Sequence, residues 1–215
     1  MEIIYISILF FTFLSGESKN LKFSSYSLIP HSLLISISIF VLAYLNNISS
    51  LYLIAVLDLI VRAFLMPYLL IVLLRNRLTE ETTPSIIHPL SIALSIVILS
   101  VGYKSINTFQ SLIFPDVLSC FSAGVMLFVY GMFLLLSKKD IIKMIISFFV
   151  IENGIHFLMI SMIPHMPKFI ELALTVNFVI AIFLFIYITR KLSEITVLEE
   201  IKKFRNSKSI LKIQE

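Results

Sequence analysis

The chain has 215 residues, of which 59% are hydrophobic and 14% are charged, whereas an ordinary soluble domain has roughly half and a quarter. A water-soluble fold of this length cannot hide so much apolar surface, so most of the chain is expected to contact membrane lipid. The net charge of +4 falls in short predicted loops and a tail, which favours a membrane surface and excludes nucleic acid as the expected partner.

Long apolar runs that are nearly devoid of charge predict about seven transmembrane helices, or six if the first is not a true span. The first run is short, and the fourth is marginal, against the ~20 residues that a ~30 Å hydrocarbon layer requires. The expected fold is one all-α, polytopic transmembrane domain. The predicted spans are Ile3–Ser15, Ser27–Leu45, Leu51–Leu74, Ile86–Gly102, Val117–Leu136, Ile141–Ile163 and Phe169–Ile188.

The positions of Lys and Arg predict how these spans are oriented. One side receives most of them, including the basic tail that begins at Arg190, while the other side receives Lys104 and Lys168. By the positive-inside rule, the N-terminus is expected outside and the C-terminus in the cytoplasm, with the protein in the cell membrane. Residues 1–191 are predicted to form the transmembrane domain, and residues 192–215 a cytoplasmic tail.

Ionisable residues inside the predicted spans are the first candidates for function, because a charge at mid-bilayer costs at least ~2.5 to 3.5 kcal/mol. Arg62 lies near the middle of the third span, and Asp58 precedes it at the i, i+4 spacing of an ion pair. Arg62 is either a fixed cation that tunes the proton affinity of nearby carboxylates or half of a structural pair with Asp58. Pro67, in the same span, should disturb the helix locally.

The sixth predicted span carries the strongest candidate site. Glu152 falls at its centre, with Asn153 beside it and His156 one turn on, so the carboxylate and the imidazole share a helix face. A buried carboxylate and a histidine can exchange protons in the physiological range. The alternative is that the two side chains only hold helices together.

Four further residues are weaker candidates. Lys143 is expected to extend to the cytoplasmic interface mainly as an anchor, with a smaller chance of facing the polar path. Glu171 opens the seventh span and is either a helix-end charge or part of a proton exit, and Asn177 follows within that span. His31, beside Pro30, is expected to be a helix-end or packing residue.

No cofactor or metal is expected on this chain. Cys120 stands alone in an apolar stretch, which predicts a buried packing residue and excludes a disulfide or iron–sulfur centre held by this chain by itself. No further His or Cys has ligand spacing to Glu152 and His156.

The stretch Ile151-Glu152-Asn153-Gly154-Ile155-His156 resembles the ENG-x-H segment of the hydrogenase-4 component E family. Its basic approach from Ser137 to Lys143, the Pro167 to Leu172 turn and the Arg190-Lys191 exit are similar to that family's flanks. A second patch, Val61 to Pro67 followed by Arg75-Asn76, resembles the family's TK-x-LL-x-P helix, with Arg62 where lysine is usual.

The last two helices of that family are similar to the K subunit of complex I and the C subunit of cation/proton antiporters. The resemblance implies a membrane subunit of a hydrogenase or complex I-like redox complex, with no metal of its own, beside antiporter-like subunits. One departure is Asn177, which stands where the family commonly has aspartate, so a second titratable station is missing or is replaced by Glu171.

Two functional hypotheses follow for this non-catalytic subunit of an oxidoreductase complex. In the first, Glu152 and His156 relay protons, Arg62 tunes them, and Asn177 is a hydrogen-bonding link. In the second, the subunit transports nothing and packs between antiporter-like subunits.

Overall fold

The structure is a computed structural model that describes residues 2–45, 47–74, 88–110 and 115–162, together with scattered positions between 169 and 191. The chain divides into two compact units, Met1–Phe178 and Val179–Glu215. The helices α1 to α7 all lie in the first unit.

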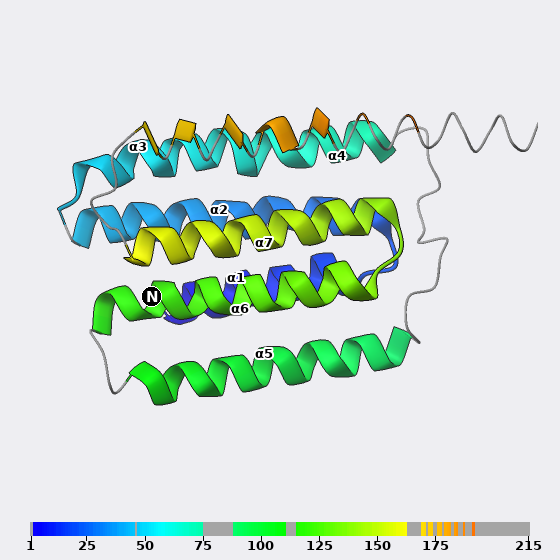
Figure 1. The fold of residues 1–215 in the computed structure, drawn as a ribbon, viewed down its shortest axis with the longest axis horizontal. Helices are drawn as coiled ribbons and strands as arrows, with labels where there is room; N and C mark the ends of the chain where they lie inside the picture. The colour runs from blue at the N-terminus through cyan, green and yellow to red at the C-terminus, as the bar shows by residue number, and fades with distance from the viewer. Residues whose placement is uncertain are drawn as a thin grey trace, which may run out of the picture. The chain divides into compact units, whose positions relative to one another are not determined.

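Apart from short connecting turns, the described residues are helical and contain no β-strand, which confirms the all-α prediction. A long helical run consists of α3, a π-helix named η1, and α4, which follow one another without a break. In Figure 1, α5 lies along one side of the group α1, α2, α6 and α7, and the α3–α4 run lies along the other. The elements are α1 (Glu2–Glu17), α2 (Leu21–Leu45), α3 (Ser49–Asp58), η1 (Leu59–Leu65), α4 (Met66–Leu74), α5 (His88–Gln110), α6 (Pro115–Ser137) and α7 (Ile141–Met162).

Among the described residues, four helical stretches are long and apolar enough to cross a membrane, so the protein is a membrane protein. They overlap the second, third, fifth and sixth predicted spans. They are Leu21–Leu45, Leu51–Val72, Cys120–Ser137 and Ile141–Met162. Helix α1 has 16 residues and rises only about 24 Å, and the apolar part of α5 is also short, in agreement with the weakness of both runs in the sequence. The seventh span falls largely outside the described residues, and the predicted tail lies entirely outside them.

Side-chain caps fix where two of the helices begin. The Asn20 side chain accepts hydrogen bonds from the backbone N–H groups of Lys22 and Phe23, and Asp140 accepts one from Ile142, as N-cap residues do. Helix α2 therefore begins well before the predicted bound at Ser27.

Helices α6 and α7 make the closest contact in the unit, because their backbones touch at glycine. A Cβ on Gly154 would lie 2.5 Å from the amide nitrogen of Phe128 and 2.8 Å from the carbonyl oxygen of Gly124. A Cβ on Gly131 would likewise lie 2.8 Å from the amide nitrogen of Ile151. Small residues allow this approach in membrane helices, and the contact sets the position of the ENG segment.

The two ends of the helix group differ in charge. Helices α1 and α6 finish at the end where α2, α5 and α7 begin (Figure 1). We call it the basic end, because its described residues include Lys19, Lys22, Lys138, Lys139 and Lys143.

Candidate functional site

The first part of the site lies in the π-helical stretch η1. The N–H of Met66 bonds to the carbonyl of Val61, five residues back, and the stretch ends just before Pro67, whose missing N–H interrupts an α-helical ladder. The local disturbance expected at Pro67 takes this form. Arg62 in η1 and Asp58 at the end of α3 form the predicted ion pair, with Nε 3.0 Å from Oδ1 and both side chains 1% exposed.

The guanidinium of Arg62 joins this helical run to α7. Its Nη1 donates to Oδ1 of Asn153 at 2.5 Å, and its Nη2 donates to Oε1 of Glu152 at 3.4 Å. Together with Nε toward Asp58, each of the three guanidinium nitrogens faces a different partner. A planar fork of donors suits this arrangement, whereas the ammonium of lysine could not reproduce it.

Glu152 and His156 share a face of α7 but meet different partners. The Nδ1 atom of His156 lies 3.2 Å from Oδ2 of Asp58, while Glu152 faces Arg62. The sequence predicted that Glu152 and His156 are neighbours on α7. In the structure each of them pairs with a residue of the α3–η1 run instead. Of the two carboxylates, Glu152 is the more exposed, because its side chain is 16% exposed and that of Asp58 is 1% exposed.

His31 also belongs to this group. It packs inside the helix group, as one of the two expectations had it, but it does not lie at a helix end. It is fully buried, ten residues inside α2, because the Asn20 cap starts that helix early. Its Nε2 lies 3.1 Å from Nδ2 of Asn153, and its Nδ1 lies 2.9 Å from Oγ1 of Thr12 in α1.

We call these residues, Asp58, Arg62, Glu152, Asn153, His156 and His31, the mid-helix cluster. Arg62 and Glu152 both lie near the middle of their helical runs. The cluster has two carboxylates against one guanidinium, so with both imidazoles neutral it has one surplus negative charge. The binding of one proton would neutralise this surplus charge.

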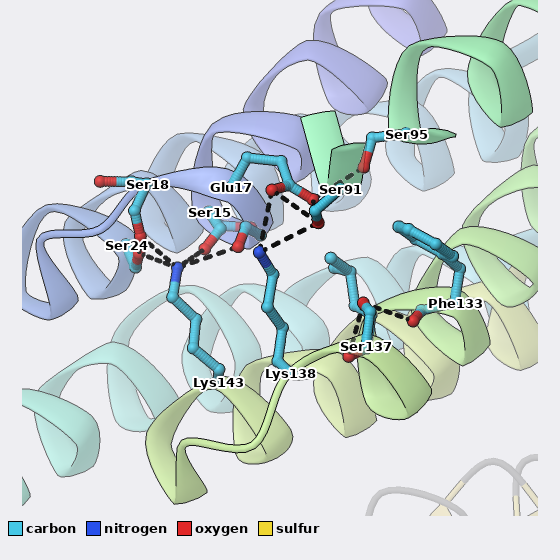
Figure 2. A network of polar contacts seen from close by, with 12 residues as sticks. Ser15, Glu17, Ser18, Ser24, Ser91, Ser95, Phe133, Ser137, Lys138 and Lys143 are labelled. Atoms are coloured by element: carbon cyan, nitrogen blue, oxygen red, sulfur yellow. Dashed lines mark hydrogen bonds and ion pairs between the residues drawn. The ribbon is translucent and has the colours of Figure 1, made fainter. Parts of the chain in front are cut away.

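A second buried polar group, which the sequence reasoning missed, lies at the basic end (Figure 2). The carboxylate of Glu17, the last residue of α1, accepts from Lys138 Nζ at 2.9 Å. It also accepts from the hydroxyls of Ser91 at 2.9 Å and Ser95 at 2.7 Å on α5. Glu17 is 5% exposed and Lys138 2% exposed, so the ion pair is buried.

Lys143 is the second buried lysine of this group, whereas the sequence predicted a side chain that extends to the cytoplasmic interface mainly as an anchor. Its side chain is 1% exposed. Its ammonium donates to the carbonyls of Ser15 at 2.9 Å, Gly16 at 3.0 Å and Ser18 at 2.5 Å, and to the Ser24 hydroxyl at 2.6 Å (Figure 2). The carbonyls at the C-terminus of α1 have no helical partners and attract a cation.

We call this second group, Glu17, Ser91, Ser95, Lys138 and Lys143, the basic-end cluster. A signal for it was present in the sequence. Ser91 and Ser95 are one turn apart on an apolar helix, and Glu17 directly follows the first apolar run. None of these features identifies a partner without the packing of α1 against α5 and α6.

The remaining predicted residues do not join either cluster in the part of the chain that is described. Asn177 is helical and exposed, and Glu171 lies outside the described residues. Cys120 is buried, as predicted. Among the described residues no group of three His, Cys, Asp or Glu side chains could hold a metal ion.

Comparisons with known proteins give no match to a protein-family model, to a curated protein or to a solved structure. The structure itself brings the ENG-x-H segment and Arg62 into contact.

Proposed function

We propose that this protein is a membrane-embedded subunit of a hydrogenase or complex I-like redox complex and that the mid-helix cluster binds and releases protons there. The observation that supports it most directly is the contact of Arg62 with Glu152 and Asn153. Buried ionisable groups in the middle of membrane helices are costly, and in membrane proteins they typically mark ion or proton pathways.

The chemistry of the cluster fits proton exchange. Glu152 and His156 are groups that can gain or lose a proton, whereas Arg62 stays charged. Arg62 therefore acts as a fixed positive charge, and the proton that balances the surplus carboxylate can reside on Glu152 or on His156. Glu152 is the partly exposed member, so it is the natural point of exchange with a neighbouring subunit or with water.

The proposed partners are the other membrane subunits of the complex, including antiporter-like subunits. Affinity purification of the tagged chain from native membranes, followed by protein identification, tests this assignment. Recovery of a redox enzyme together with large antiporter-like subunits supports it. Recovery of the chain with none of these proteins contradicts it.

The Glu152→Gln substitution tests the relay role, because the amide keeps the shape and a hydrogen-bond acceptor but cannot carry a proton. We expect intact complex in membrane vesicles with proton translocation reduced roughly 10²-fold, the range that a lost proton-transfer group typically gives. Asp140→Asn is the matched control, since asparagine also caps a helix and Asp140 lies outside the cluster. Unchanged translocation by Glu152→Gln would exclude the relay.

The second candidate function is that of a subunit that transports nothing and serves assembly. The observation that favours it is the backbone contact between α6 and α7 beside the cluster, which shows close packing around these polar groups. It predicts that Glu152→Leu lowers the amount of assembled complex. Full assembly of Glu152→Leu with lost translocation would support the proton role instead.

A further inference from the structure

The hydrogen bonds around Asn153 run in one direction, and their order follows from chemistry alone. Arg62 can only donate, so the Asn153 atom that it contacts must be the amide oxygen. The amide nitrogen of Asn153 then faces Nε2 of His31 at 3.1 Å. Because that nitrogen can only donate, Nε2 must be the acceptor and carries no hydrogen.

The other side of the imidazole leads to the same conclusion. The hydroxyl of Thr12 donates to the carbonyl of Ile8 at 2.6 Å, so its oxygen is left to accept from Nδ1 of His31, 2.9 Å away. The Ile8 carbonyl itself lies 3.4 Å from Nδ1 and can only accept as well. Nδ1 therefore carries the hydrogen, and His31 is neutral with one defined tautomer.

The imidazole is held in this position by packing on its face. The ring of Phe149 on α7 lies edge-on to it, with centroids 6.1 Å apart. Both α1 and α7 thus fix the ring, and His31 is completely buried. A change of hydrogen bonding must then come from rotation of the Asn153 amide, which needs no movement of a helix.

We infer that Asn153 couples the protonation of His31 to the position of Arg62, which makes His31 a third proton-binding residue of the cluster. A proton can form an Nε2–H bond on His31 only if the Asn153 amide turns by about 180° and offers its oxygen. The step takes the proton from a hydronium ion and leaves water. The turned amide would present its nitrogen to Arg62, so that the bond between Arg62 and Asn153 breaks.

The charged groups that surround this step favour such an exchange. Arg62 opposes a second positive charge on His31 while it is bound to Asn153, and Asp58 and Glu152 can hold the released guanidinium. His156 faces Asp58 on the far side of the cluster. Asn153 is thus a positioning residue, and its importance for proton transport rests on the proposed function, whereas the tautomer of His31 does not.

Nitrogen NMR of the full-length chain in lipid nanodiscs, with ¹⁵N-labelled histidine, tests the inference. The chain has four histidines, and loss of a signal in His31→Gln assigns the residue. In the unmodified protein we expect His31 to be neutral with hydrogen on Nδ1. Hydrogen on Nε2, or a doubly protonated ring at neutral pH, would overturn the inference without any variant.

The Asn153→Asp substitution provides the second test. A carboxylate at this position can only accept hydrogen bonds. It would keep the bond from Arg62 and would need an N–H donor at Nε2 of His31, while the Thr12 oxygen still accepts from Nδ1. Both ring nitrogens would then have to carry a hydrogen. We expect the signal of the unprotonated ring nitrogen to disappear. Asn20→Asp, the same change at an exposed cap, should leave His31 as it is, and a neutral His31 in Asn153→Asp would overturn the coupling.

The NMR outcomes are separable from those of the translocation assay. Failure of Glu152→Gln to alter proton transport would remove the proposed function and leave the coupling of His31 to Asn153 intact. A wrong tautomer would remove the coupling and leave the role of Glu152 intact.

Discussion

The mid-helix cluster and the basic-end cluster are both buried and both ionic, yet their bonding differs. In the basic-end cluster, Glu17 bonds to three side chains and Lys143 to four oxygen atoms, most of them at 3.0 Å or less. In the mid-helix cluster, Arg62 reaches Glu152 only at 3.4 Å, and two imidazoles are present. Charges whose hydrogen bonds are all made favour one protonation state, whereas imidazoles and a longer contact allow a proton to be added or removed.

The signs of the surplus charges differ as well. Lys138 and Lys143 against Glu17 leave one surplus positive charge at the basic end, and the mid-helix cluster has one surplus negative charge. The two clusters therefore differ both in how completely their charges are bonded and in the sign of their surplus charge.

The largest effect is expected for Glu17→Ala, which leaves Lys138 buried without its carboxylate. Removal of one partner from a buried pair typically costs 3 to 5 kcal/mol, roughly, because the other charge is stranded. We expect a loss of about this size in the free energy of unfolding, measured by denaturant titration in mixed micelles. The double variant Glu17→Leu with Lys138→Leu should recover much of it, and equal losses in the single and double variants would refute the buried pair.

A smaller loss of stability is expected for Arg62→Lys, together with a loss of transport. Lysine keeps the charge, so no carboxylate is stranded, but it lacks the fork that faces Asp58, Glu152 and Asn153. We expect a net loss of about 1.5 to 3 kcal/mol, the value of one hydrogen bond to a charged group. We expect translocation in membrane vesicles to fall while Lys139→Arg, an exposed basic change, leaves it intact. Full transport by Arg62→Lys would mean that only the charge matters.

Gly154→Ala should loosen the contact that positions the mid-helix cluster. Its Cβ would meet backbone atoms of Phe128 and Gly124, and overpacking typically costs about 1 to 3 kcal/mol. The matched control is Gly102→Ala, whose Cβ would meet only the flexible side chain of Met126 at 3.1 Å or more. Thermal unfolding in nanodiscs compares them, and equal stability of the two variants would contradict the close backbone approach.

The smallest effect is expected for Thr12→Val, which keeps the shape of the side chain and removes the acceptor for Nδ1 of His31. A typical hydrogen bond contributes about 0.5 to 1.5 kcal/mol, and we expect a loss of unfolding free energy in that range. Ser7→Ala, which removes a hydroxyl bonded within α1 to Ile3, should change stability less. A larger loss for Ser7→Ala than for Thr12→Val would contradict a stabilising bond between Thr12 and His31.

The sequence was sufficient to predict the elements and contacts that depend on local order. Apolar runs identified the long helices because lipid demands them, and the Asp58–Arg62 pair followed from one turn of one helix. The glutamate of the ENG segment was placed correctly at mid-helix for the same reason.

Contacts between helices were not predictable in this way. Hydropathy cannot say which helix lies opposite Lys143, so an anchor and a buried cap on α1 look alike in the sequence. His31 was misjudged because the serines from Ser24 to Ser27 made the start of the second span look later than it is. Glu17 was overlooked because it follows the apolar run and its serine partners lie 74 and 78 residues away.

The π-helical stretch gives the third span an unusual tolerance. A π-turn takes in more residues than an α-turn over the same length, so a one-residue deletion between Leu59 and Leu65 can be absorbed by tightening the coil. The polypeptide could then still cross the bilayer, while the guanidinium would be carried around the axis and away from α7. A change of length at this point would thus leave membrane insertion intact while it removes the contacts between Arg62 and α7.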